Sequence, residues 1–153
     1  MYQVTNYING KECTESNESI AIINPSYGTD IGEVLYATKD SANNAIDAAA
    51  KQFKTWYKTG LSYRAELILK LRQGIINRSD EIINICVSEA GKTRPDAEAE
   101  LDRAIQALTH TAGVQHFYPS IMSPNVAGGI DITDVRYPIG VVVGSLEVLG
   151  FHP

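Results

Sequence analysis

The side chains best suited to covalent or metal chemistry are scattered along the chain. They are Cys13, Cys86, His110, His116 and His152. Zinc sites need cysteine or histidine ligands at short, recurring spacings, so this distribution predicts no zinc site. Two distant cysteines also give no disulfide framework, which favours a reducing, cytoplasmic environment.

A nucleophilic role for Cys86 can be judged from its neighbours. Ile82 precedes it by four residues and Ala90 follows it by four, so we expect the thiol on the apolar stripe of a helix. Burial among apolar groups disfavours the thiolate, which is the reactive form. We therefore predict that Cys86 packs in the core and that Cys13 lies in or beside a hairpin, with no catalytic role for either.

Gly140 and Gly144 are the only hint of a phosphate-binding loop. Their spacing is not that of a dinucleotide-binding turn, and no helix with open N–H groups is evident after them. The sequence therefore predicts no cofactor-binding residues in this chain, and close backbone approach within a sheet explains the two glycines more simply.

Composition and charge narrow the class of protein. The 153 residues are 44% hydrophobic, which is enough to bury the core of one domain. The formal net charge of -5 disfavours binding to nucleic acid or to an anionic membrane surface. The sequence opens without a secretory signal, and its longest apolar stretch, Ile139–Phe151, is interrupted by polar and glycine residues and falls short of the ~20 residues of a membrane span. We expect a cytoplasmic protein.

Turn-forming residues divide the start of the chain into short extended segments. Asn9-Gly10 accepts the positive φ values of a tight turn and predicts a β-hairpin. Ser19–Ile23 is rich in β-branched residues and runs into a turn that ends at Gly28. Glu33–Ala37 is then expected to be extended again.

A helical period of apolar residues occupies the middle of the chain and predicts four amphipathic helices. The second is expected to begin with Ser62 as its cap, the third with Ser79 as its cap, and the fourth with Pro95 in its first turn. The first is capped by Asp40 or Ser41 and ends at Gly60, and Gly91 ends the third.

Two extended segments are predicted after the helices. Asp131–Tyr137 alternates polar and apolar side chains, as a half-buried strand does. Ile139–Val143 is apolar throughout, as in a parallel strand that is buried on both faces. The predicted fold class is therefore α/β, with four amphipathic helices and the beginning of a parallel sheet.

Several short motifs, none diagnostic by itself, occur in a particular order. They are Tyr7-Ile8-Asn9-Gly10, Ile23-Asn24-Pro25-x-x-Gly28, Ala45 to Trp56 as A-I-x-A-A-x-x-x-F-x-x-W, Arg64, Gly91-Lys92-Thr93 and Pro138-x-Gly140-Val141-Val142. In this order the chain resembles the amino-terminal third of an aldehyde dehydrogenase. The segment Asn125-Val126-Ala127-x-Gly129-Ile130-Asp131 further resembles the CoA-acylating branch, the methylmalonate-semialdehyde dehydrogenases.

The resemblance implies the activity and the domain to which the chain belongs. The implied reaction is oxidation of a short semialdehyde that carries a carboxylate, with NAD as hydride acceptor and coenzyme A as acyl acceptor. Residues 1–153 would be part of the cofactor-binding domain, with the start of its Rossmann-like sheet, in a homo-oligomer. The catalytic domain, with the family's nucleophilic cysteine and glycine-rich nucleotide turn, would lie beyond residue 153.

The resemblance stops at Ser145. The family's oxyanion-stabilising asparagine would follow a few residues later, but its position falls on Leu149, or on Phe151 if an insertion is allowed. A frameshift, a premature stop or a cloning artefact would each give this pattern. Because the family's nucleophile, general base and oxyanion amide are all missing from these residues, we expect the chain alone to be inactive.

Arg103 is the substrate-binding residue that the resemblance implies. It lies twelve residues after Gly91, where the branch has an arginine that meets the substrate carboxylate. A guanidinium can hold a carboxylate through two parallel hydrogen bonds, which would select semialdehydes over plain aldehydes. Judged on the residues alone, an arginine one turn from Glu100 is equally typical of a surface ion pair.

A monovalent-cation site is the second implied feature. Its ligands would be the Glu89 carboxylate and the backbone carbonyls of Ile22 and Ile23. Hard oxygen ligands suit such an ion, although a glutamate at a helix end near Lys92 needs no ion to explain it.

Two alternatives stay open. The chain could belong to a general or succinate-semialdehyde dehydrogenase instead of the methylmalonate branch. It could also be a non-catalytic module, because four amphipathic helices can form a small domain that binds a partner or associates with itself.

Overall fold

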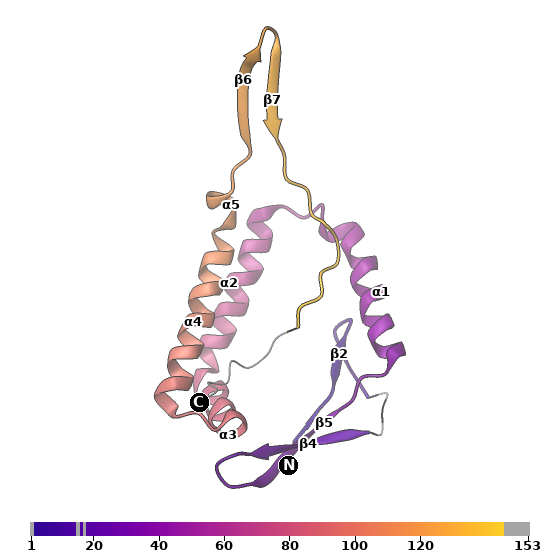
Figure 1. The fold of residues 1–153 in the computed structure, drawn as a ribbon, viewed down its shortest axis with the longest axis vertical. Coiled ribbons are helices and arrows are strands. Elements are labelled where there is room, and N and C mark those ends of the chain that lie inside the picture. The colour runs from indigo at the N-terminus through magenta and orange to yellow at the C-terminus, as the bar shows by residue number, and fades with distance from the viewer. Residues whose placement is uncertain (1, 15, 17, 146–153) are drawn as a thin grey trace.

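The computed structural model describes residues 2–14, 16 and 18–145, and it is a mixed α/β arrangement of strands, helices and a final hairpin (Figure 1). The strands are β1 (Tyr2–Val4), β2 (Asn6–Ile8), β3 (Lys11–Cys13), β4 (Ser19–Asn24), β5 (Thr29–Leu35), β6 (Ile121–Ala127) and β7 (Ile130–Asp134). The helices are α1 (Lys39–Trp56), α2 (Leu61–Asn77), α3 (Ser79–Ala90), α4 (Arg94–Ala112) and the single turn α5 (Val114–Phe117). The four predicted amphipathic helices are confirmed.

The hairpin of β2 and β3 forms where the sequence predicts it. Asn9 and Gly10 both have positive φ, 52° and 79°, as the two central residues of a type I′ turn require. Tyr7 pairs with Glu12 across the two strands.

Strands β1, β4 and β5 form a three-stranded sheet in the order β1-β5-β4. β1 runs parallel to β5, with Tyr2 opposite Gly32, and β4 runs antiparallel to β5. Gly32 permits the close approach of β1, because a Cβ at this position would lie 2.6 Å from the backbone oxygen of Tyr2. The predicted strand at Ser19–Ile23 is confirmed, whereas the one predicted at Glu33–Ala37 begins earlier, at Thr29, and ends at Leu35.

Three of the predicted helix caps are wrong. Thr38 caps α1: its hydroxyl accepts a hydrogen bond from the Ser41 N–H at 3.1 Å, so Ser41 is the third residue of the helix and not its cap. α2 begins after Gly60, one residue ahead of Ser62, with no side-chain cap. Arg78 ends α2 and also precedes α3, which leaves Ser79 inside the helix. Gly91 as the stop of α3 and Pro95 in the first turn of α4 are both confirmed.

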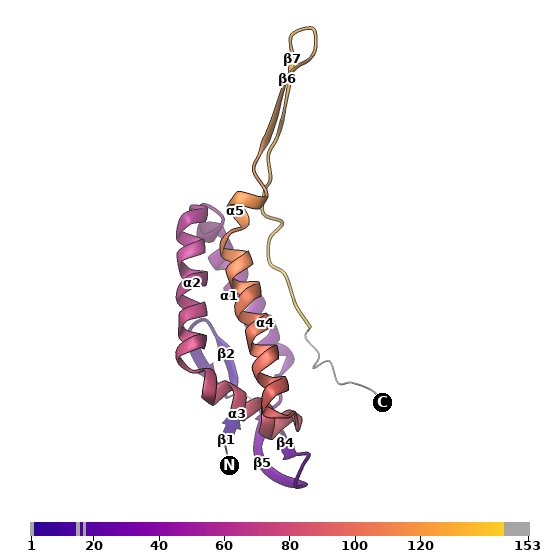
Figure 2. The ribbon, with the colours of Figure 1, turned by 90° about the vertical axis from the view of Figure 1, so that its left-hand side faces the viewer.

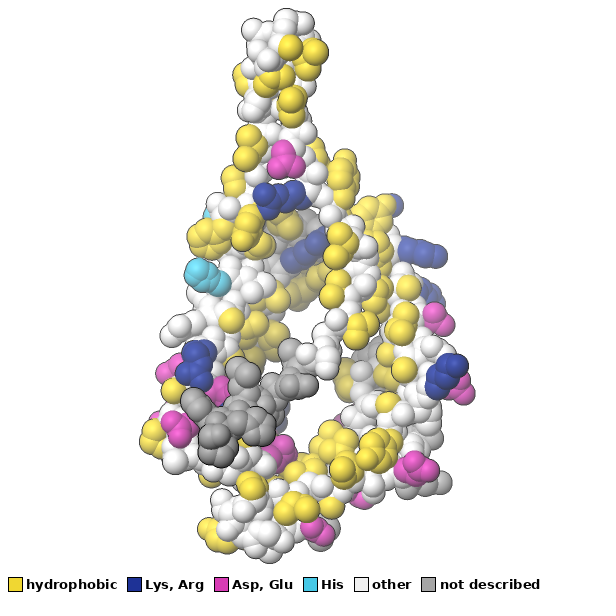
Figure 3. All heavy atoms as spheres, viewed as in Figure 1, with side chains coloured by type: hydrophobic (Ala, Val, Ile, Leu, Met, Phe, Trp, Pro, Cys, Tyr) yellow, Lys and Arg dark blue, Asp and Glu magenta, His cyan; other side chains and the backbone are white. Residues whose placement is uncertain are grey.

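The helices pack mainly through α2, α3 and α4. α2 and α4 lie side by side along most of their length, and α3 joins them at one end (Figure 2). Ile83 of α3 and Ala97 of α4 are among the few buried apolar residues. α1 stands across an opening from this group, and hydrophobic side chains line parts of the edge of that opening (Figure 3).

Arg64 connects α1 to α2. Its guanidinium donates hydrogen bonds to the backbone oxygens of Trp56, at 2.7 Å, and Tyr57, at 3.0 Å. The same group lies 5.3 Å from the centre of the Trp56 ring. Arg64 therefore satisfies carbonyls at the end of α1 and fixes the turn into α2.

The hairpin of β6 and β7 projects away from the rest of the chain (Figure 1). β7 overlaps the predicted strand Asp131–Tyr137, but it starts one residue earlier, at Ile130, and ends at Asp134. β6 was not predicted, because Pro124 and Asn125 are typical turn residues. In the structure the register shifts between Ser123 and Ala127, so this stretch is accommodated as an irregularity in the ladder.

The prediction of a doubly buried strand at Ile139–Val143 is wrong for this structure. The segment has no regular secondary structure, and Ile139 is 93% and Val143 80% exposed. A strand of this kind needs neighbouring strands on both edges, and none of the described strands pairs with it. The prediction that Leu149 or Phe151 stands at the position of the oxyanion asparagine concerns residues outside the described ranges.

The uncovered apolar surface is large. The accessible area is 12120 Å² for a chain of 16.7 kDa, whereas a compact monomer of that mass exposes about 7,600 Å². The apolar stripes and strands of this chain are therefore only partly buried by one another.

Candidate functional site

The junction between α3 and α4 brings the helices onto the sheet. Gly91 ends α3 with φ 64°, a left-handed conformation that glycine adopts without strain. A Cβ on Gly91 would lie 2.7 Å from the Cγ of Pro25, in the turn between β4 and β5. The end of α3 and this turn are therefore held in close contact by the absence of a side chain.

Glu89, two residues before Gly91, is bound by the first strand. The Tyr2 hydroxyl donates a hydrogen bond to the Glu89 carboxylate. The carboxylate acceptor is the main cause that raises the pKa of Tyr2 to about 12, and burial and the negative charge of Glu89 act in the same direction. Lys92, which the sequence suggested as a neighbour of Glu89, pairs with Glu100 instead.

Ile22 and Ile23 lie on β4, the strand against which α3 packs. The ladder between β4 and β5 changes register between these two residues, and such a bulge disturbs the regular pairing of backbone groups. The structure thus places the three residues of the implied cation site on neighbouring elements. Among the described residues, no group of three or more His, Cys, Asp or Glu side chains could hold a metal ion.

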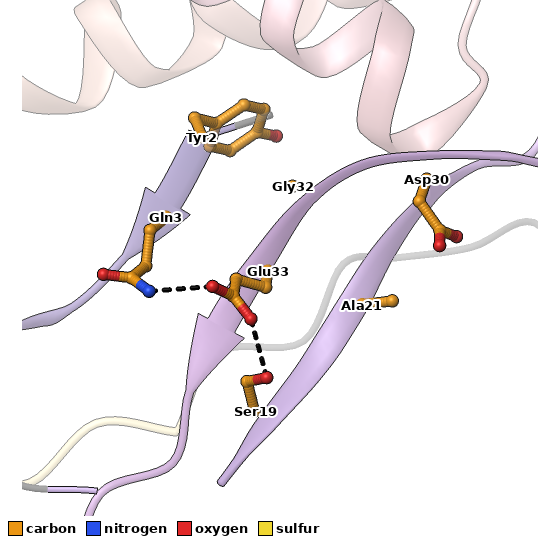
Figure 4. A pocket seen from close by; sticks show the side chains of 7 residues that line it. All are labelled: Tyr2, Gln3, Ser19, Ala21, Asp30, Gly32 and Glu33. Atoms are coloured by element: carbon orange, nitrogen blue, oxygen red, sulfur yellow. Dashed lines mark hydrogen bonds between the residues drawn. The ribbon is translucent and has the colours of Figure 1, made fainter. Parts of the chain in front are cut away.

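A polar cluster on the sheet was missed by the sequence analysis. The Glu33 carboxylate on β5 accepts hydrogen bonds from Gln3 Nε2 and Ser19 Oγ, each at 2.7 Å, and these bonds lower the pKa of Glu33 (Figure 4). The side chains of these three residues line a cavity of about 290 Å³, together with Tyr2 and Asp30. Each carboxylate oxygen of Glu33 accepts one of these hydrogen bonds, so Glu33 cross-links strands β1, β4 and β5. In the sequence, only the alternation of side chains along β1 and β5 could have indicated this cluster.

Arg103 lies apart from these residues, on α4. It is nine residues beyond the start of the helix, about 14 Å along the axis from Arg94. Its side chain is exposed, and it makes no hydrogen bond or ion pair with any described residue. The surface ion pair with Glu100 is not formed, because Glu100 Oε2 lies 2.5 Å from Lys92 Nζ.

The two cysteines form no disulfide with each other within the described ranges. Cys13 and Cys86 are half-buried free thiols, so Cys86 is less buried than the core position predicted for it. His110 stacks on Phe117, with 5.5 Å between ring centres. In the same part of the chain, no helix is both long and apolar enough to cross a bilayer.

The Tyr2–Glu89 hydrogen bond predicts a pH-dependent contribution to stability. Since the folded-state pKa of Tyr2, about 12, lies above the ordinary 10.0, this contribution is complete below pH 10 and is lost as the pH rises toward 12. We expect Tyr2→Phe to lower the free energy of unfolding by up to about 1 kcal/mol at neutral pH. The variant should also lack the part of the decrease in this free energy at alkaline pH that comes from losing the Tyr2–Glu89 bond. Urea unfolding at several alkaline pH values measures both effects.

Tyr7→Phe is the matched control for that substitution. Tyr7 is a 72% exposed tyrosine on β2 and makes no hydrogen bond through its hydroxyl in the described structure. Removal of the Tyr7 hydroxyl should leave the free energy of unfolding with the same dependence on alkaline pH as in the unaltered chain. Equal pH profiles for Tyr2→Phe and the unaltered chain would show that the Tyr2 bond does not contribute.

The chain belongs to the aldehyde dehydrogenase family, whose model matches residues 13–145. Within that family it is similar to the amino-terminal segment of the malonate- and methylmalonate-semialdehyde dehydrogenases. It is 34% identical over 140 residues to the malonate-semialdehyde dehydrogenase of Bacillus pumilus (strain SAFR-032), and the aligned part covers 91% of this chain and 29% of that protein. The corresponding enzyme of Lacticaseibacillus casei is 33% identical over 140 residues, covering 91% and 28%.

Solved structures agree with this assignment. The methylmalonate-semialdehyde dehydrogenase of Oceanimonas doudoroffii superposes with a TM-score of 0.81 at 30% identity, covering 86% of this chain and 27% of that one. A Sinorhizobium meliloti 1021 structure assigned to the same enzyme, and determined with NAD, gives 0.85 at 27% identity, covering 92% and 29%. The chain thus spans less than a third of the length of the relatives it matches.

Proposed function

We propose that this chain is the amino-terminal segment of an NAD-dependent, CoA-acylating semialdehyde dehydrogenase that acts on malonate or methylmalonate semialdehyde. The observation that carries the proposal is the exposed, unpaired guanidinium of Arg103 in a segment similar to these enzymes.

Arg103 is proposed to bind the carboxylate of the substrate. Its guanidinium offers two parallel N–H donors that match the two oxygens of a carboxylate. The rigid helix α4 would fix the position of the acid group and hence the distance of the aldehyde from the reacting centre. A plain aldehyde has no group to make this contact.

The remainder of the chemistry is assigned to polypeptide beyond this segment. NAD, when bound, accepts the hydride of the aldehyde, and coenzyme A accepts the acyl group as carbon dioxide is released from methylmalonate semialdehyde to give propionyl-CoA. Residues 1–153 are proposed to form part of the cofactor-binding domain. In the complete protein Ile139–Val143 would pair as a strand of its Rossmann-like sheet, which fits its unbroken apolar sequence.

Glu89 and the carbonyl oxygens of Ile22 and Ile23 are proposed to hold a monovalent cation in the complete protein. Their oxygen donors fit such an ion, and the register change at these two isoleucines is compatible with carbonyls that are free to turn toward it. Because the Tyr2 hydroxyl now occupies the Glu89 carboxylate, binding would require Tyr2 to yield or to share this group.

The uncovered apolar surface supports a further proposal about the assembled enzyme. Strands β6 and β7 are exposed along their whole length, and a two-stranded sheet whose outer edges pair with no other described strand is a favourable place for association. We therefore propose a homo-oligomer. The acidic net charge and free thiols fit a cytoplasmic protein.

The proposal is tested by comparing the 153-residue chain with a fusion enzyme. In the fusion enzyme, residues 1–145 of this chain are followed by the part of the Bacillus pumilus relative that lies beyond its match. With malonate semialdehyde, NAD and coenzyme A, we expect no NADH from the chain alone and NADH with acyl-CoA from the fusion enzyme. NADH formed by the chain alone would refute the assignment of the chemistry to other polypeptide, and turnover without coenzyme A would refute the acylating branch.

A further inference from the structure

The charged side chains of α4 are nearly all engaged by neighbours. Arg94 binds Asp80 and Glu98, and Asp96 accepts a hydrogen bond from the Thr93 hydroxyl at 2.7 Å. Glu100 binds Lys92. Of the six charged residues on this helix, only Asp102 and Arg103 have no such bond with the described part of the chain.

The pair between Glu100 and Lys92 is the unexpected member of this set. Glu100 precedes Arg103 by three residues, the spacing at which opposite charges on a helix meet. Its carboxylate instead turns to Lys92, whose side chain is only 23% exposed. A partly buried ammonium needs a partner more than an exposed guanidinium does, because it has lost more of its hydration.

The backbone on either side fixes where the Lys92 side chain begins. Gly91 ends α3 in the left-handed conformation, and Thr93 caps α4 through its hydroxyl. Lys92 is therefore the single residue between two defined helix ends. From that point its ammonium reaches the Glu100 carboxylate, eight residues later.

We propose that Lys92 is a positioning residue, which holds Glu100 away from Arg103 and so keeps the Arg103 guanidinium open for the substrate carboxylate. This inference rests on the proposed function of Arg103 as the carboxylate-binding residue. Lys92 itself touches no substrate in this account. It acts by removing the internal carboxylate that would compete for the same N–H donors.

The test uses the 153-residue chain, with malonate as a small carboxylate probe. Nitrogen-15 NMR of arginine side chains follows the exchange of the Arg103 Nε–H and the malonate concentration that half-saturates its shift. In Lys92→Met, Glu100 is released and should pair with Arg103. We expect slower Nε–H exchange and an approximately twofold higher half-saturating malonate concentration, the size of a single exposed helical ion pair.

Three variants serve as controls. Lys92→Arg keeps the cation and should behave as the unaltered chain. Adding Glu100→Gln to Lys92→Met removes the competing charge and should restore the original malonate affinity. Glu100→Gln alone should leave the Arg103 signal and the malonate affinity unchanged, because Glu100 is already paired with Lys92. This variant tests the inference even where Lys92→Met does not fold.

Two results would overturn the inference. One is an unchanged Arg103 signal and malonate affinity in folded Lys92→Met. The other is tighter malonate binding in Glu100→Gln alone, which would mean that Glu100 already competes for Arg103. Neither result depends on turnover. The role of Arg103 in substrate binding is therefore tested separately, by the kinetics of the fusion enzyme.

Discussion

Replacement of Gly91 by alanine is expected to lower the free energy of unfolding by about 3 kcal/mol. Two costs add at this position. A residue with a Cβ pays about 1 kcal/mol or more to hold φ at 64°. The new Cβ would also lie 2.7 Å from the Cγ of Pro25, so that α3 or the turn between β4 and β5 must shift. Urea unfolding followed by circular dichroism measures the loss.

Gly28 offers a matched control for the backbone part of this effect. It has the same φ of 64°, but a Cβ there would meet nothing within 4 Å. Gly28→Ala should therefore cost only about 1 kcal/mol. In a Pro25→Ala background the nearest atom to the new Cβ is gone, and Gly91→Ala should then resemble Gly28→Ala. Equal losses for the two glycine variants in the unaltered background would disprove a packing role for Gly91.

The features that the sequence predicted well are those decided by a few adjacent residues. The positive φ values at Asn9 and Gly10, the helix stop at Gly91 and Pro95 in the first turn of α4 all follow from local steric preferences. Such preferences act on neighbouring atoms, so they hold whatever surrounds them. The same reason explains why four helices were recognised from the period of their apolar residues.

The failures have a different origin, because they depend on what else is packed nearby. Ile139–Val143 has the composition of a buried strand, but a strand forms only where other strands offer backbone partners. The caps at Ser62 and Ser79 failed because Gly60 and Arg78 already set the chain direction into the next helix. The cap of α1 was misplaced since Thr38 and Ser41 are both capable, and the pair forms a capping box.

The candidate site could be anticipated only through family resemblance. Arg103 has no feature in its own sequence context that distinguishes a substrate ligand from a surface arginine. What makes it available is the capture of Glu100 by Lys92, a contact over eight residues. The bond between Tyr2 and Glu89 spans 87 residues and brings a strand to a helix end, which no local pattern indicates.

Substitution of Arg103 by methionine in the fusion enzyme is expected to lower kcat/KM for malonate semialdehyde by about 10- to 100-fold, the loss that follows removal of a hydrogen-bonded charged partner. Propanal has no carboxylate, so its kcat/KM should change little. Arg103→Lys keeps the charge but not the paired N–H donors and should give an intermediate loss. Initial rates of NADH formation with the two aldehydes measure the discrimination.

Lys51 provides the matched control for Arg103→Met. Lys51 is an exposed cation on α1 that makes no hydrogen bond or ion pair in the described structure, and Lys51→Met removes the same unit of charge from the chain. If the effect of Arg103 were general electrostatic attraction of an anionic substrate, Lys51→Met would reproduce part of it. If Arg103→Met weakened turnover of both aldehydes equally, its role would be structural. Only a selective loss for the semialdehyde agrees with direct binding of the carboxylate by a guanidinium that Lys92 has left free.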